Sequence, residues 1–301
     1  MTPPKNTRDR GKKPPFKKSG SPRGDVGDKF SGTGKKRFVK RIETPGLHDP
    51  RPHDPGPGQE ALAGVHCVRE ALKAGRRRFY RIYIADTAPR DRLRPIVEQA
   101  GQLKIDVVPI PPEELDQLCP DVRHQGIVAI VGPLPLPKAE TAIQKMDIKG
   151  KNAFVLILES MEDPHNLGAL IRTALCAGVD YIFLPKDRAV SPTPAVSRAS
   201  AGALEHAPLC SVTNTTTLLR SLKKKGFWVA GLDAAGDQSL FQADFTGNIA
   251  LVVGGEHKGI RPLVKKECDF LLSLPMAQGV TSLNASVAGG IAMYEVLRQR
   301  G

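Results

Sequence analysis

The strongest constraint on the fold is a series of short apolar runs between residues 151 and 301. The first run, Phe154–Glu159, is continuously apolar up to its last residue, which is typical of a central parallel strand covered on both faces. Similar runs follow at 181–184, 227–232, 249–254 and 270–274. Helical patterns lie between them at 168–177, 216–225 and 261–267, and one at 283–298 closes the chain. This alternation predicts an α/β domain with a parallel sheet, whose functional residues should lie at the carboxyl ends of the strands.

A second, smaller α/β pattern precedes this one, over residues 59–132. It predicts helices at 62–72, 92–100 and 113–118, and strands at 79–84, 107–110 and 126–131. Pro133, Pro135 and Pro137 then indicate a stiff connector, so 133–150 is expected to be a linker to the domain at 151–301.

The first 58 residues differ from the rest in composition and charge. They contain ten prolines and nine glycines and almost no apolar cluster, which predicts a disordered tail. Residues 1–42 carry 14 Lys and Arg but three acidic residues, whereas the whole chain has a formal net charge of +13. The basic charge therefore belongs mainly to this tail, which is expected either to contact phosphates or only to keep the protein soluble.

Several classes of protein are excluded by what the sequence lacks. No apolar run approaches the roughly 20 residues of a membrane-spanning helix, and the first residues do not resemble a secretory signal. The five cysteines are dispersed without a Cys-x-x-Cys pair, so neither a zinc site nor a disulfide framework is expected. These observations predict a cytoplasmic protein that needs no metal.

Three loops at predicted strand ends contain the polar residues most suited to a site. They span 159–168, which leads into a helix bearing Arg172, then 254–259 and 274–284. Each loop also has a purely structural interpretation, because Asp163, Asn166, Ser282 and Asn284 are all good turn or helix-cap residues. Asn166 and Arg172 are six residues apart, about 240° around a helix, so periodicity alone does not bring them together. No single loop identifies a reaction.

Taken together and in this order, the loops resemble the three motifs of the SpoU/TrmH family of RNA ribose 2′-O-methyltransferases, in the SPOUT superfamily. The matching segments are Asp163–Ala174, Gly254–Gly259, and Leu274–Met276 with Ser282–Asn284. The segment 184–188, Leu-Pro-Lys-Asp-Arg, also resembles the RlmB-like branch, which methylates a guanosine in 23S rRNA. The resemblance extends from about Gly64 to the end of the chain and leaves the basic tail outside.

This resemblance implies a fold, a cofactor and partners that the residue pattern alone does not. The catalytic domain of the family has a deep trefoil knot, whose loops hold S-adenosylmethionine (AdoMet), and its members are homodimers. The small leading domain of the family binds RNA. No metal and no membrane are involved.

Site residues follow from the resemblance position by position. It implies catalytic roles for Arg172, Asn166, Glu256, Ser282 and Asn284. It implies cofactor contacts at Gly254, Gly255, Leu274, Met276 and Leu283. Plausible phosphate contacts in the small domain are Arg76, Arg77, Arg78, Arg81 and Arg123.

The expected reaction is methyl transfer from AdoMet to the ribose 2′-hydroxyl of a guanosine in 23S rRNA. A guanidinium has a pKa above about 12, so Arg172 is expected to stabilise the developing alkoxide rather than to act as a general base. Two alternatives stay open: a tRNA guanosine as the target, and a non-catalytic RNA-binding factor of ribosome assembly.

Overall fold

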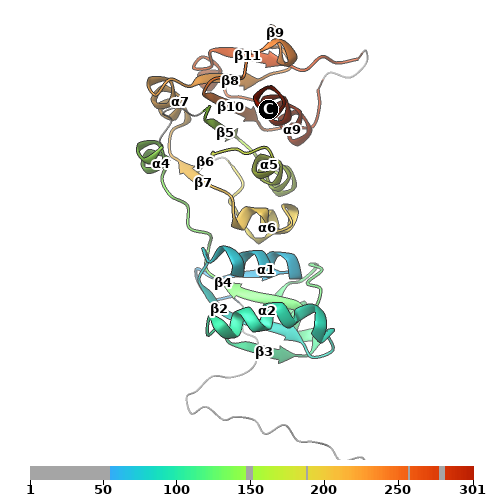
Figure 1. Cartoon of the computed structure of the whole chain (residues 1–301). Coiled ribbons are helices and arrows are strands. Elements are labelled where there is room, and N and C mark those ends of the chain that lie inside the picture. Colours follow the sequence, from blue (N-terminus) through green and yellow to red (C-terminus); the bar gives the residue numbers. More distant parts are fainter. Residues whose placement is uncertain (1–54, 147–151, 188, 257, 278–281) are drawn as a thin grey trace, which may run out of the picture. The chain divides into compact units, whose positions relative to one another are not determined.

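The computed structural model describes residues 55–146, 152–187, 189–256, 258–277 and 282–301. These described residues form one compact unit, which contains two sheets (Figure 1). The tail predicted at 1–58 lies almost entirely outside the described residues. Among the described residues, no helix is long and apolar enough to cross a membrane.

The smaller sheet has four strands in the order β1-β4-β2-β3. The strands are β1 (Glu60–Ala63), β2 (Phe79–Ala85), β3 (Val107–Ile110) and β4 (Ile127–Val131). Only β2 and β3 pair in parallel; the other two pairs are antiparallel. The helices are α1 (Val65–Ala74), α2 (Arg90–Gln102) and α3 (Pro112–Leu118).

The helices of the smaller domain lie on both faces of its sheet, and alternate side chains of β4 pack against each set. Ile127 and Val131 pack in the cluster that includes residues of α1 and α2, whereas Val128 and Ile130 pack with Leu115 of α3. Every residue of β4 is therefore buried, as expected for a central strand.

One prediction in this domain is wrong at its first residues. Leu62 and Ala63 belong to β1 rather than to the helix predicted from residue 62. Gly64, at φ 101°, separates the strand from α1, and this backbone conformation is open to glycine but costly for other residues. Pairing of Leu62 with Ala129 of β4 outweighs the helical spacing of the apolar residues.

The larger sheet is parallel, as the apolar runs predicted, with the order β7-β6-β5-β10-β8-β11-β9. Its strands are β5 (Phe154–Glu159), β6 (Tyr181–Pro185), β7 (Leu209–Val212), β8 (Trp228–Leu232), β9 (Gln238–Ser239), β10 (Ile249–Gly254) and β11 (Phe270–Ser273). In-register pairing aligns Gly254 of β10 with Glu159 of β5 at the carboxyl edge.

Helices cover both faces of the larger sheet (Figure 1). They are α4 (Ala139–Lys145), α5 (Pro164–Cys176), α6 (Pro194–Ala199), α7 (Thr215–Lys224), α8 (Pro262–Lys265) and α9 (Ala285–Arg300). Phe154, Leu156 and Leu158 of β5 face the core shared with α5 and α9. Val155 and Ile157 face the core shared with α4 and α7. The sequence pattern did not predict α4, α6, β7 or β9.

Candidate cofactor and RNA site

A cavity of about 520 Å³ opens at the carboxyl ends of β8, β10 and β11. All three loops singled out in the sequence contribute to it, either by lining it or through hydrogen bonds to its lining residues. The expected cofactor residues line it: Gly254, Gly255, Leu274, Met276 and Leu283. Glu256, Ser282 and Asn284 line it as well. The loops therefore converge in space, although Asn166 and Asn284 are 118 residues apart in the chain.

Asn166 joins the first loop to the other two through its side chain. Its amide nitrogen donates to the Glu256 carboxylate, and its carbonyl oxygen accepts a hydrogen bond from Asn284 Nδ2 at 3.0 Å. Asn166 is buried, and it does not cap a helix with its side chain. Asp163 caps α5 instead, accepting from the backbone of His165 at 3.0 Å and of Asn166 at 3.3 Å. The capping interpretation of Asn166 is therefore wrong.

Asn284 both caps a helix and belongs to this network. Its Oδ1 accepts from the backbone amides of Ser286 at 2.9 Å and Val287 at 3.3 Å, which fixes the start of α9. Its Nδ2 remains free to reach Asn166. Asn284 is therefore both the cap of α9 and a hydrogen-bond partner of Asn166.

Close backbone contact explains the glycines of the second loop. A Cβ atom on Gly255 would lie 2.1 Å from the carbonyl oxygen of Ser160, and one on Gly254 would lie 2.3 Å from the carbonyl carbon of Gly259. Ser160 itself has φ 56°, a left-handed conformation that is uncommon outside glycine. The first and second loops thus touch backbone to backbone, and no side chain could separate them.

Sequence analysis missed an acidic residue of the cavity, Asp233, which directly follows β8. Burial acts to raise the pKa of Asp233, but hydrogen bonds from Lys265 and from the backbone of Ala235 leave it lowered. The carboxylate is therefore ionised near neutral pH. Its position after a strand of a parallel sheet was the available signal, since ligand-binding residues gather at such ends.

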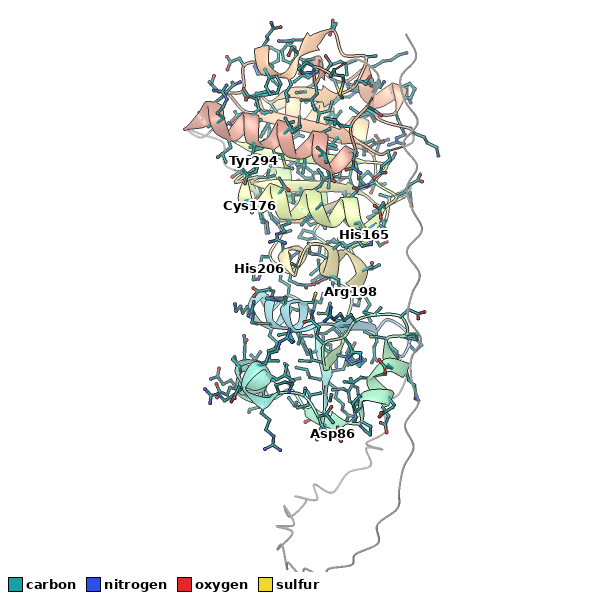
Figure 2. The ribbon with its side chains drawn as sticks, turned by 90° about the vertical axis from the view of Figure 1, so that its right-hand side faces the viewer. Asp86, His165, Cys176, Arg198, His206 and Tyr294 are labelled. Carbon is teal, nitrogen blue, oxygen red and sulfur yellow. The ribbon has the colours of Figure 1, made fainter. Side chains whose placement is uncertain are left out.

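Arg172 lies apart from the cavity within one chain. It is exposed on α5, and it does not line the cavity that the three loops form. Together with His165 and Cys176 it belongs to the solvent-facing stripe of this helix. Figure 2 shows His165 and Cys176 on α5, with Tyr294 on the neighbouring α9.

The expected phosphate-binding arginines fall into two groups. Arg77 is buried, and it pairs with Glu205 at 2.8 Å and with Glu60 at 2.6 Å. Arg76 donates to the backbone carbonyls of Glu205 at 3.3 Å and Ala207 at 2.6 Å. These two side chains are occupied by the protein itself, which argues against their expected contacts with phosphate.

The other three arginines remain open to solvent to different degrees. Arg78 and Arg123 are exposed, and the Arg78 guanidinium lies 4.8 Å from the centre of the Tyr80 ring. Arg81 is partly buried and lies 4.0 Å from Asp106. Within the described ranges, no group of three or more His, Cys, Asp or Glu side chains is arranged to hold a metal ion.

Two family models match the two domains of the chain. Residues 153–294 match the SpoU rRNA methylase family, and residues 61–137 match the domain described as RNA 2′-O ribose methyltransferase substrate binding. YacO of Bacillus subtilis, a TrmH family tRNA/rRNA methyltransferase by name, is 41% identical over 239 residues, which cover 79% of this chain and 95% of that protein.

A second relative supports the same assignment, and a solved structure shares the fold. The 23S rRNA (guanosine-2′-O-)-methyltransferase RlmB of Shewanella oneidensis is 39% identical over 80% of this chain and 98% of its own. The fold matches that of the SpoU methyltransferase AviRb from Streptomyces viridochromogenes, whose crystal structure contains AdoMet, with a TM-score of 0.69 at 22% identity. That match covers 81% of this chain and 91% of AviRb. The chain is therefore a member of the SpoU family of AdoMet-dependent RNA ribose 2′-O-methyltransferases.

Proposed function

We propose that this protein transfers a methyl group from AdoMet to the ribose 2′-hydroxyl of a guanosine in 23S rRNA. The observation that carries the proposal is the convergence of the three loops on one cavity, tied together by Asn166, Glu256 and Asn284. RlmB of Shewanella oneidensis is named for methylation of a guanosine in 23S rRNA. It aligns with this chain over nearly the whole length of RlmB, and the aligned part of this chain includes the smaller domain.

The residues that line the cavity suit AdoMet chemically. Gly254 and Gly255 allow close approach of the neighbouring backbone, since any side chain at these positions would collide with Gly259 or Ser160. Leu274, Met276 and Leu283 offer apolar contacts for an adenine ring, and the Asp233 carboxylate can accept hydrogen bonds from ribose hydroxyls. We expect these residues to hold the cofactor, which supplies an activated sulfonium methyl group.

The protein then has to orient the 2′-hydroxyl and stabilise the negative charge that develops on its oxygen. Asn166, fixed by Glu256 and Asn284, is suited to position the ribose, and Ser282 lies exposed at the mouth of the cavity. Arg172 is the residue proposed to stabilise the developing charge, with the proton lost to water or to a phosphate oxygen. A guanidinium does this without giving up a proton of its own.

Because Arg172 does not line the cavity of its own chain, we propose that a homodimer completes the site. α9 carries an exposed apolar stripe that includes Val287, Tyr294 and Leu297, beside the exposed face of α5. Such a stripe is unusual on a monomer surface and suits a self-complementary interface. A second copy on this face would bring Arg172 of one subunit toward the cavity of the other.

Two further features of the family are proposed for this chain. The trefoil knot is supported by β10 lying between β5 and β8 and by the packing of α9 on α5. RNA binding by the smaller domain is supported by its family match and by the exposed Arg78 and Arg123. An rRNA substrate would place the protein in the cytoplasm.

The direct test is to incubate the purified chain with radiolabelled AdoMet and unmodified 23S rRNA or tRNA, and then to map the 2′-O-methyl group. We expect label at one guanosine of 23S rRNA. Label in tRNA would overturn the substrate, and bound AdoMet without any methylated RNA would favour a non-catalytic assembly factor.

A further inference from the structure

A second hollow lies at the same edge of the larger sheet, on the other side of β5. It consists of two adjoining spaces of about 340 and 370 Å³, at the carboxyl ends of β6 and β7. The two spaces share Thr213, Thr215 and Arg261 and are called here the Arg261 groove. Asp187 lines one space, and Asn214 and Thr216 line the other. None of these residues lines the cofactor cavity.

Arg261 is held in this groove from below by a fully buried carboxylate. Glu159, the last residue of β5, accepts a hydrogen bond from the Thr215 hydroxyl at 2.9 Å. The same carboxylate forms an ion pair with Nε of Arg261. Another nitrogen of Arg261 lies 3.5 Å from the Thr215 hydroxyl. The Arg261 side chain is nevertheless 37% exposed, so part of its guanidinium fork remains available to a ligand.

The charges of the Arg261 groove argue against a phosphate ligand. Arg261 is already balanced by Glu159, and among the described residues that line the groove the other charged one is Asp187, an acid. These three groups sum to one negative charge, whereas phosphate sites require a surplus of positive charge or of backbone amides. The groove instead suits a neutral group that presents hydrogen-bond donors to a carboxylate and acceptors to a guanidinium.

Guanine has this arrangement of donors and acceptors. Its N1–H and N2–H groups are adjacent donors that one carboxylate can accept together, and its O6 and N7 are the acceptors that arginine contacts most often. Adenine and cytosine each offer an amino group without a second donor beside it. We propose that the Arg261 groove binds the guanine base of the target nucleotide, with Asp187 on the N1/N2 edge and Arg261 on the O6/N7 edge.

The groove and the cofactor cavity are linked by the first two loops. Arg261 follows the second loop by two residues, and its partner Glu159 is the first residue of the first loop, paired in register with Gly254. β5 and β10 are neighbours, so the two hollows flank one pair of strands. An RNA base unstacked from its neighbours can be read on its edges in such a groove while its ribose lies at the chemical site.

This inference rests on the proposed function, because it requires a guanosine target. The test uses the full-length protein and an rRNA fragment whose mapped target position holds either guanosine or inosine, which lacks the N2 amino group. We expect kcat/KM of the unmodified protein to be roughly 10- to 100-fold lower on inosine. Asp187→Asn should lower kcat/KM on guanosine by a similar factor and bring the guanosine-to-inosine ratio close to one.

A matched control is Glu140→Gln, which removes one negative charge from an exposed position of α4 outside the groove. It should leave the guanosine-to-inosine ratio unchanged. Equal activity on inosine and guanosine, or an unchanged ratio in Asp187→Asn, would overturn the guanine pocket while leaving the proposed reaction intact. If the unmodified protein methylates no guanosine in any RNA, the proposed function itself fails.

Discussion

The three loops of the larger domain are far apart in the sequence but close together in the structure. In the smaller domain, the consecutive arginines Arg76–Arg78 instead have three different environments. The loops meet at one cavity, although Asn166 and Asn284 are 118 residues apart. The three consecutive arginines separate: Arg77 is buried, Arg76 donates to backbone carbonyls, and Arg78 stays exposed. Strand ends in a parallel sheet have their place set by the topology, whereas the fate of a surface charge depends on what packs next to it.

The buried arginine also shows why charge density is a weak guide to RNA contacts. Arg77 is fixed by two carboxylates, Glu60 and Glu205, and donates to the carbonyl of Gly132 at 3.1 Å. Glu205 in turn accepts from the hydroxyl of Ser197 at 2.9 Å. A buried, paired arginine of this kind contributes to structure rather than to ligand binding.

Replacing Arg172 should give the largest effect on activity. Arg172→Ala should lower kcat for methyl transfer by about three orders of magnitude, since it removes the group proposed to stabilise the developing alkoxide. The Kd for AdoMet, measured by calorimetry, should change less than about twofold, because Arg172 is proposed to act on the ribose hydroxyl rather than on the cofactor. Loss of AdoMet binding in place of turnover would show that the residue acts on the cofactor.

The arginine pair offers a contrast between stability and binding. Arg77→Ala should lower the free energy of unfolding by about 3–5 kcal/mol, because it leaves the Glu205 carboxylate buried and unpaired. Arg78→Ala should change it by less than about 0.5 kcal/mol, since that side chain is exposed. Denaturant unfolding measures both free energies. Equal effects of the two substitutions would contradict the assignment of a structural role to Arg77 but not to Arg78.

Asn166 is expected to act together with its two partners. Asn166→Ala should lower kcat/KM about 10- to 100-fold by releasing Glu256 and Asn284 from their fixed positions. The double variant with Asn284→Ala should lose less than the sum of the two single losses, since both remove the same hydrogen bond. Strict additivity in this double-mutant cycle would mean that the two side chains work independently.

Cysteine reactivity gives a smaller, purely chemical contrast. Burial, with a further contribution from Asp269, raises the pKa of the Cys268 thiol to about 12, so this thiol stays protonated up to strongly alkaline pH. Cys176 is exposed on α5. At pH 8, iodoacetamide followed by peptide mass spectrometry should therefore modify Cys176 well before Cys268. The reverse order would show that Cys268 is accessible.

The sequence predicted the parallel sheet because continuous apolar runs such as Phe154–Glu159 require burial on both faces. It also predicted the site loops, through strand ends and through the family resemblance. It could not predict that Asp163 caps α5 and so frees Asn166, because both residues are good caps. Nor could it predict the burial of Arg77, which depends on Glu205, 128 residues away. Such pairings are set by tertiary packing rather than by local pattern.

The convergence of the three loops on one cofactor site is tested most directly by filling the cavity. Ala288 of α9 lines it and is only partly buried, so Ala288→Phe should block the cavity without disturbing the core. Leu103→Phe, at an exposed position of the smaller domain outside the lining, is the control. Calorimetry should show AdoMet binding abolished in Ala288→Phe, with an unchanged melting temperature, and retained in Leu103→Phe. Normal AdoMet binding by a folded Ala288→Phe variant would contradict the assignment of this cavity.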